Sequence, residues 1–136
     1  MRRQRVLMLA LVAGGGLIAC HGNPAAPKDS LLAPGRWATE NGACLTVTAT
    51  ICNLVVGCGH GQFPPPVVRV DGTFDVDGTY RIEVGPVSTN PAPAAHFSGS
   101  VTGSQLIVNV TPSGSLPPAS YLMTPTSTGT CSAPCV

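Results

Sequence analysis

Hydrophobic and polar residues alternate most regularly in the segment TFDVDGTYRIEV, residues 73 to 84. A period of two is typical of a β-strand that buries one face. A two-residue hairpin turn at Asp77-Gly78 would bring the polar residues that follow it to the inner face. The pattern therefore predicts one long strand that bends at Gly78. Its inward side is expected to carry Phe74, Val76, Gly78, Tyr80, Ile82 and Val84.

A second regular pattern, FSGSVTGSQLIVNV, predicts a hairpin over residues 97 to 110. Its turn at Gly103-Ser104 places glycine first, as a type II′ turn prefers. Partners across such a hairpin share one face of the sheet. The expected inward pairs are Val101 with Leu106, Gly99 with Val108 and Phe97 with Val110.

Two further hairpins are expected earlier in the chain. A loop at Asp71-Gly72 is predicted to pair Val70 with Phe74 and Val68 with Val76. The segments CLTVT and NLVVGC predict the other hairpin, and alternation gives it one apolar face. The inward residues of this hairpin are expected to be Leu45, Val47, Leu54, Val56 and Cys58.

The strand pattern predicts an all-β fold. Trp37 opens the domain, Tyr121 and Met123 mark a late strand, and no segment after residue 20 shows the 3.6-residue apolar repeat of an amphipathic helix. We expect a small antiparallel up-and-down meander of seven to eight strands over residues 35–136, barrel-like or a flattened sandwich. Proline-bearing loops are expected at residues 61–66, 85–94, 111–118 and 125–134.

The first 19 residues have the layout of a signal peptide. Arg2, Arg3 and Arg5 precede an apolar run over residues 6–18. This run is about 20 Å long as a helix, which is short for a hydrocarbon core of about 30 Å. The segment is therefore expected to be removed during secretion rather than to stay as a membrane span.

The end of this run, Leu17-Ile18-Ala19-Cys20, resembles the lipobox of bacterial lipoproteins. The resemblance implies that the thiol of Cys20 receives a diacylglyceryl group and that its amine receives an acyl chain such as palmitate after cleavage. Two or more chains anchor a protein stably, whereas one holds it marginally. Because His21 rather than Asp follows the cysteine, the resemblance implies the outer membrane more than the inner one. The alternative is an ordinary signal peptide cleaved near Ala25 or Ala26.

Residues 20–34, CHGNPAAPKDSLLAP, are expected to form a semi-extended tether between the membrane and the domain. Loss of the leader removes three of the seven basic residues, so four remain against six acidic ones and the mature charge is about −2. No basic patch survives, and a nucleic-acid partner is not expected.

A longer pattern covers most of residues 35 to 131 and resembles a family of uncharacterised small secreted bacterial β-proteins. It supports the β fold and implies no activity. The matching residues are Cys58, His60, Gly61, Gly72, Phe74, Val76, Gly78, Tyr80, Gly85, Pro86, Phe97, Ser98, Gly99, Val101, Gly103, Leu106 and Cys131.

Of the six cysteines, five remain when Cys20 is set aside for the lipid, and an odd set in an oxidising compartment leaves one thiol over. The family resemblance implies a bridge between Cys58 and Cys131. A bridge between Cys44 and Cys52 is disfavoured, because Cys52 is expected in the turn of its hairpin, too far from Cys44. Bridges from Cys135 to Cys44 or to Cys52 both stay open.

The residues give little support for catalysis or for a metal. The acidic side chains of the predicted strands face outward, His96 faces outward, and His60 lies in a Gly-His-Gly turn. The set Cys52, Cys58, His60, Cys131 and Cys135 has ligand types that suit zinc or copper, but its spacing contains no short C-x2-C pair. We therefore expect no enzyme activity, no cofactor and no metal.

The expected protein is a membrane-anchored envelope lipoprotein, a non-enzymatic binding or structural module with an envelope protein or the cell wall as partner. One alternative is a carrier whose cavity is lined by Phe74, Tyr80, Phe97 and Val108. Another is an inhibitor of an envelope-targeting hydrolase that inserts the loop CGHGQFPPP. The contact residues of that loop would be His60, Gln62, Pro64, Pro65 and Pro66.

Overall fold

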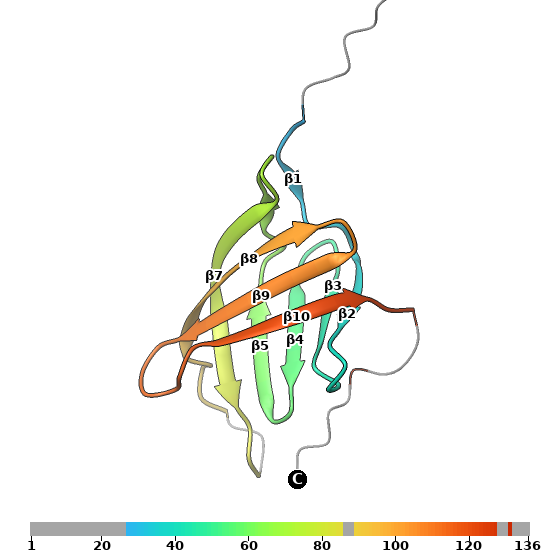
Figure 1. The fold of residues 1–136 in the computed structure, drawn as a ribbon. Coiled ribbons are helices and arrows are strands. Elements are labelled where there is room, and N and C mark those ends of the chain that lie inside the picture. Colours follow the sequence, from blue (N-terminus) through green and yellow to red (C-terminus); the bar gives the residue numbers. More distant parts are fainter. Residues whose placement is uncertain (1–26, 86–88, 128–130, 132–136) are drawn as a thin grey trace, which may run out of the picture.

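The structure is a computed structural model, and it describes residues 27–85, 89–127 and 131. In this part of the chain the strands are β1 (Ser30–Leu31), β2 (Gly35–Ala38), β3 (Cys44–Val47), β4 (Cys52–Val56), β5 (Gly59–Phe63), β6 (Val67–Val68), β7 (Thr73–Ile82), β8 (Ala94–Thr102), β9 (Gln105–Pro112) and β10 (Ala119–Pro125). Eight of them form a closed antiparallel barrel in the order β10-β2-β3-β4-β5-β7-β8-β9 (Figure 1). The remaining two, β1 and β6, pair with each other outside the barrel.

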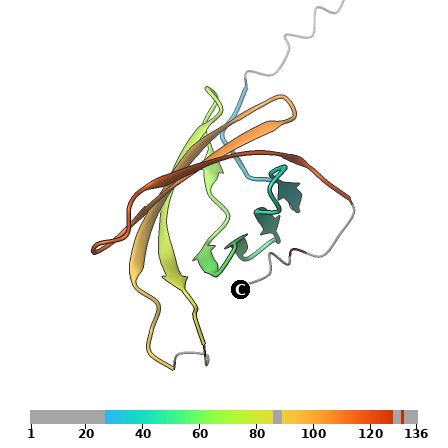
Figure 2. The same ribbon diagram turned by 60° about the horizontal axis from the view of Figure 1, so that its bottom comes forward.

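This architecture confirms the all-β antiparallel fold and selects the barrel over the flattened sandwich. Barrel neighbours follow one another along the chain, except that β5 is joined to β7 because β6 leaves the sheet to pair with β1. Closure pairs the first and last barrel strands, β2 and β10, over two residues each, so only part of the sheet edge that an open meander would expose is covered. Figure 2 shows the barrel tilted so that its lower end comes forward.

The β8–β9 hairpin has the expected register. Val101 pairs with Leu106, and Phe97 pairs with Val110. Gly103 has a φ of 58°, the left-handed value that the turn requires. The side-chain alternation and the turn chemistry agree here, so the local sequence is sufficient to determine the pairing.

Strand β7 is a single strand through Gly78, as expected, with Phe74 and Tyr80 buried on its inner side. Ile82 and Val84, also expected on this side, do not join the core, because both side chains are exposed. The strand ends at Ile82, beyond the packed part of the interior. Alternation alone does not reveal where along a strand the core stops.

The β3–β4 hairpin is also confirmed, with Leu45 paired to Leu54 and both side chains buried. Cys58 is not part of it, since β4 ends at Val56 and Cys58 lies in the turn that leads to β5. The expected turn position of Cys52 is wrong as well. Cys52 is the first residue of β4, pairs with Val47 and is fully buried.

Strand β5 replaces the first part of the loop expected over residues 61–66. A turn does occur at Asp71-Gly72, where the N–H of Gly72 donates to the carbonyl of Arg69, but the pairs expected across it are wrong. Val68 pairs with Ser30, and the N–H of Arg69 donates to the carbonyl of Thr73, which is a different register from Val70 with Phe74. Two of the three inner positions of β5 are Gly59 and Gly61, which give no hydrophobic signal, and the third is Phe63. Because these two glycines have no side chain, the rings of Tyr80 and Phe97 from other strands lie directly against them.

Three phenylalanine rings fill the barrel interior. Phe63 and Phe97 stack with ring centroids 4.3 Å apart, and Phe74 is buried beside the same core. The rings lie directly on glycine backbones: a Cβ added at Gly61 would sit 3.1 Å from the ring of Phe97. Of the four residues expected to line a ligand cavity, Phe74, Phe97 and Val108 are packed in the core with at most 2% exposure. The fourth, Tyr80, is 8% exposed and lines only a small pocket of about 160 Å³.

The chain enters at one end of the barrel and closes it. Leu32 is buried, and its N–H donates to the carbonyl of Pro66, which is itself fully buried. Asp29 accepts a hydrogen bond from the N–H of Val70. Residues 29–34 therefore belong to the domain, and the expected tether over residues 20–34 is corrected to end before Asp29.

Candidate functional site

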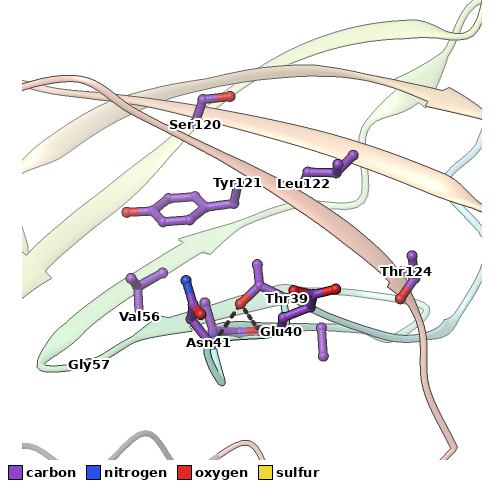
Figure 3. A pocket seen from close by; sticks show the side chains of 11 residues that line it. Thr39, Glu40, Asn41, Val56, Gly57, Ser120, Tyr121, Leu122 and Thr124 are labelled. Atoms are coloured by element: carbon purple, nitrogen blue, oxygen red, sulfur yellow. Dashed lines mark hydrogen bonds between the residues drawn. The ribbon is translucent and has the colours of Figure 1, made fainter.

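A cleft opens where β10 separates from β2. The two strands pair only through Thr124 with Ala38 and Pro125 with Trp37. Over Ala119–Met123, β10 is paired with β9 alone among the described strands. The cleft has a volume of about 600 Å³ and lies between this part of β10 and the turns that follow β2 and β4 (Figure 3).

The turn after β2 explains why the cleft exists. Thr39 Oγ1 accepts a hydrogen bond from the N–H of Ala43 at 3.1 Å, and the N–H of Thr39 donates to the carbonyl of Ala43 at 2.8 Å. Gly42 has a φ of 88°, which closes this turn tightly. Because β2 turns back after four residues while β10 has seven, the first part of β10 faces no strand.

The walls of the cleft differ in chemistry. Glu40 and Asn41 lie on the turn below β10, and the ring of Tyr121 lies above Val56 (Figure 3). Leu122 also lines the cleft and is 57% exposed. The site thus combines an unpartnered stretch of strand with one carboxylate, one amide and several apolar side chains.

Tyr121 also lies close to Tyr80, and the two phenols interact electrostatically. Burial raises the pKa of both phenols, and the neighbouring Tyr121 raises the pKa of Tyr80 further. A small apolar pocket of about 160 Å³ lies beside them, lined in part by Ile82, Leu116 and Pro117. Both phenols are neutral near pH 7 and act only as hydrogen-bonding groups.

The residues expected to contact a partner do not form a projecting loop. His60 and Gln62 are exposed on the outer face of β5, where Gln62 donates to Asn53 at 2.9 Å and His60 lies 3.8 Å from Glu83. Pro64 is exposed, Pro65 is half-buried and Pro66 is fully buried. The segment is a strand and a core-packed connection, so the sequence expectation of a loop is corrected here.

The outer face of the barrel holds one close histidine–carboxylate pair. His96 Nδ1 lies 2.8 Å from Asp77 Oδ1, and both side chains are exposed, as the alternation predicted. Neither residue lines the cleft beside β10 or the small pocket beside Tyr80. An exposed pair on a convex sheet has neither the water exclusion nor the substrate positioning that general acid–base catalysis uses.

The expected Cys58–Cys131 bridge is wrong. Cys131 is bonded to Cys44, and its sulfur also lies 3.5 Å from Thr46 Oγ1. Cys44 and Thr46 point outward from β3, so Cys131 lies on the outer face of that strand. The open alternative of a Cys44–Cys135 bridge is excluded by the same bond.

The other described cysteines have different states. Cys58 is disulfide-bonded, and Cys52 is a free thiol buried in the core. Burial raises the pKa of Cys52 to about 11. A Cys52–Cys135 bridge is therefore excluded, and Cys20 and Cys135 lie outside the described residues.

Over residues 27–85, 89–127 and 131, no three His, Cys, Asp or Glu side chains gather closely enough to hold a metal ion. The same residues contain no helix of the length and hydropathy needed to cross a membrane. The proposed ligand set is separated, since Cys52 is in the core and His60 is on the outer face.

Comparisons with protein-family models, with curated proteins and with solved structures found no match to this chain. No family is therefore assigned, and the resemblances of the leader and of the domain stay predictions.

The sequence did not point to the cleft. Its principal residues, Glu40, Asn41 and Tyr121, are ordinary turn and strand residues by local pattern. The available signal was a difference in length, since a four-residue strand next to a seven-residue one leaves part of the longer strand unpaired. That signal becomes readable only when β10 and β2 are known to be neighbours.

Proposed function

We propose that this protein is a membrane-anchored envelope lipoprotein whose barrel is a non-enzymatic binding module. Its partner is an envelope protein, and the binding site is the cleft beside β10. An extended segment of the partner lies along β10 as an additional strand. The acylated Cys20 holds the module at the bilayer.

The observation that carries this proposal is the short pairing between β10 and β2. Strand addition requires a stretch of backbone without a strand partner and side pockets for alternate residues. Ala119–Met123 supply the first, and the cleft beside them supplies the second. Main-chain hydrogen bonds would then give affinity, while Glu40, Asn41 and Leu122 would select the side chains of the partner.

The orientation of the barrel supports the same function. The described chain starts at the end closed by Leu32 and Pro66, whereas the turns after β2 and β4 lie at the opposite end. A tether at the closed end presents the cleft away from the bilayer. The filled interior favours a surface site over carriage of an apolar ligand inside the barrel.

Photo-crosslinking in intact cells tests this proposal. A benzophenone side chain placed at Leu122 is expected to give one dominant adduct with an envelope protein, and the same group at Ala49, in the turn between β3 and β4, is expected to give none. Leu122→Asp is expected to reduce recovery of that partner at least tenfold. Ile107→Asp is the matched control, because Ile107 pairs with Leu122 but does not line the cleft. Equal adducts at both positions, or equal loss in both variants, would contradict the proposal.

A further inference from the structure

Three exposed aliphatic side chains occur at the end of the barrel where the described chain begins. Leu31 is 60% exposed, Val67 is 51% exposed and Val70 is 64% exposed. Leu31 and Val67 are direct partners in the β1–β6 pair, so their side chains share one face. We call these three residues the proximal patch.

The proximal patch is built on a fixed support. Val68, the next residue of β6, is half-buried and packs against the core, which leaves Val67 pointing away from the barrel. Val70 is held beside β1 because its N–H donates to Asp29 Oδ1 at 3.1 Å. The exposure of the three side chains is therefore a property of the fold at this end of the barrel.

The distance from the lipidation site to the patch is limited by chain length. Nine peptide steps separate Cys20 from Asp29, so the two Cα atoms are at most about 30 Å apart whatever the path between them. The ten residues of β7 are about as long as that limit. An anchor at Cys20 therefore keeps the closed end of the barrel within about 30 Å of the bilayer, whereas the opposite end can lie farther away by the length of the barrel.

We propose that the proximal patch rests on the bilayer surface and inserts its aliphatic side chains between the lipid headgroups. This inference rests on the proposed lipid anchor at Cys20. Contact at three residues restricts rotation of the barrel about its tether. The cleft beside β10 is then directed away from the membrane.

Charge around the patch favours zwitterionic lipid. Asp29 and Asp71 are close to Val70, and the guanidinium of Arg69 is paired with Asp75. Lys28 and Arg69 are balanced by Asp29, Asp71 and Asp75, so the described residues around the patch carry no cationic excess to attract anionic headgroups. Binding by the patch is therefore expected to change little with salt concentration.

The experiment uses the full acylated protein in vesicles of phosphatidylethanolamine and phosphatidylcholine. A benzophenone side chain is placed at Val70, or at Val84, which is 75% exposed beyond the end of β7 at the opposite end of the barrel. Phospholipid adducts are counted by mass spectrometry after irradiation. We expect at least tenfold more lipid adduct at Val70 than at Val84.

A pair of double variants tests the role of the patch itself. Leu31→Ser with Val67→Ser is expected to lower the lipid adduct at Val70 at least threefold. Val84→Ser with Ile107→Ser removes exposed aliphatic groups elsewhere and is expected to leave it unchanged. A thermal unfolding curve shows whether each variant keeps its fold. The comparison of Val70 with Val84 in the chain without serine substitutions tests the inference even if a double variant does not fold.

The acyl state of Cys20 separates two kinds of failure. The patch inference is overturned if lipid adducts are equal at Val70 and Val84, or if the adducts form mainly between two copies of the chain. If Cys20 is acylated in that case, the proposed anchor still stands. If mass spectrometry of the protein from its native membrane finds Cys20 without acyl groups, both the anchor and the inference fail.

Discussion

Cys44, the first residue of β3, is joined by a disulfide to Cys131, 87 positions later in the chain. The bond holds Cys131 against the outer face of β3. It therefore reinforces the side of the barrel where β10 and β2 pair through only two residues each. Closure of the barrel at this point depends on a covalent link as well as on hydrogen bonds.

Removal of this disulfide is expected to destabilise the barrel. The double variant Cys44→Ala with Cys131→Ala should lower the free energy of unfolding by about 4 kcal/mol, because a loop of this length costs the unfolded chain much entropy when it is closed. Urea denaturation measures the change. Cys52→Ala is the control, because it removes a cysteine that forms no bridge. The expectation is contradicted if the double variant loses no more free energy of unfolding than this control.

The bonded state of Cys58 predicts the second bridge. Cys44 and Cys131 are used, Cys52 is free, and an acylated Cys20 leaves Cys135 as the partner of Cys58. Cys44, which is bonded to Cys131, pairs with Val55, and Val55 is three residues before Cys58. Cys135 is four residues after Cys131 and can reach about 14 Å from it, which is far enough to bond Cys58. Peptide mapping without reduction should recover Cys58 linked to Cys135. A peptide that links Cys58 to Cys20 would contradict both this bridge and the anchor.

Cys52 is expected to make the fold less stable at alkaline pH. Burial raises its pKa to about 11 from the ordinary 9.0, so the folded state holds the proton more tightly than the unfolded state. The stabilisation is complete below pH 9 and is lost as the pH rises towards 11, with a total of about 2–3 kcal/mol. Denaturation at about pH 8 and about pH 11 measures this loss, to which Tyr80 and Tyr121 add in the same direction. Cys52→Ala should reduce the loss, and an unchanged loss would rule out the thiol as its source.

The buried thiol is also expected to be unreactive in the native protein. At about pH 8 a pKa near 11 leaves about one thiolate in a thousand, and the sulfur is not exposed to the reagent. A maleimide should therefore label Cys52 only after unfolding. Rapid labelling under native conditions would show that the barrel opens readily around β4.

Gly99→Ala is expected to disrupt the core. A Cβ at this position would overlap the carbonyl oxygen of Ile107 and sit 2.7 Å from the ring of Phe74. We expect a loss of about 3 kcal/mol or more, because both backbone and ring would have to move. Gly35→Ala is the matched control, since nothing lies within 4 Å of its added Cβ. Thermal unfolding compares the two, and equal effects would contradict the packing.

Local sequence is sufficient to predict those strands whose own side chains form the inner face of the barrel. The β8–β9 hairpin combines apolar partners such as Phe97 and Val110 with a glycine turn, so a one-residue shift would expose its whole inner face. Strand β7 follows the same rule until Ile82, where the core ends. The all-β class follows from these segments together with the lack of a helical repeat in the sequence after residue 20.

Tertiary structure alone decided the parts that depend on distant partners. Strand β5 has glycines where the pattern demands hydrophobic residues, because the ring of Phe97 fills the place beside Gly61 and the hydroxyl of Tyr80 fills the place beside Gly59. The pairing of Ser30 with Val68 and the bond from Cys44 to Cys131 join segments that carry no local sign of each other. The cleft beside β10 belongs to the same group, because it arises from the unequal lengths of two strands that closure of the barrel makes neighbours.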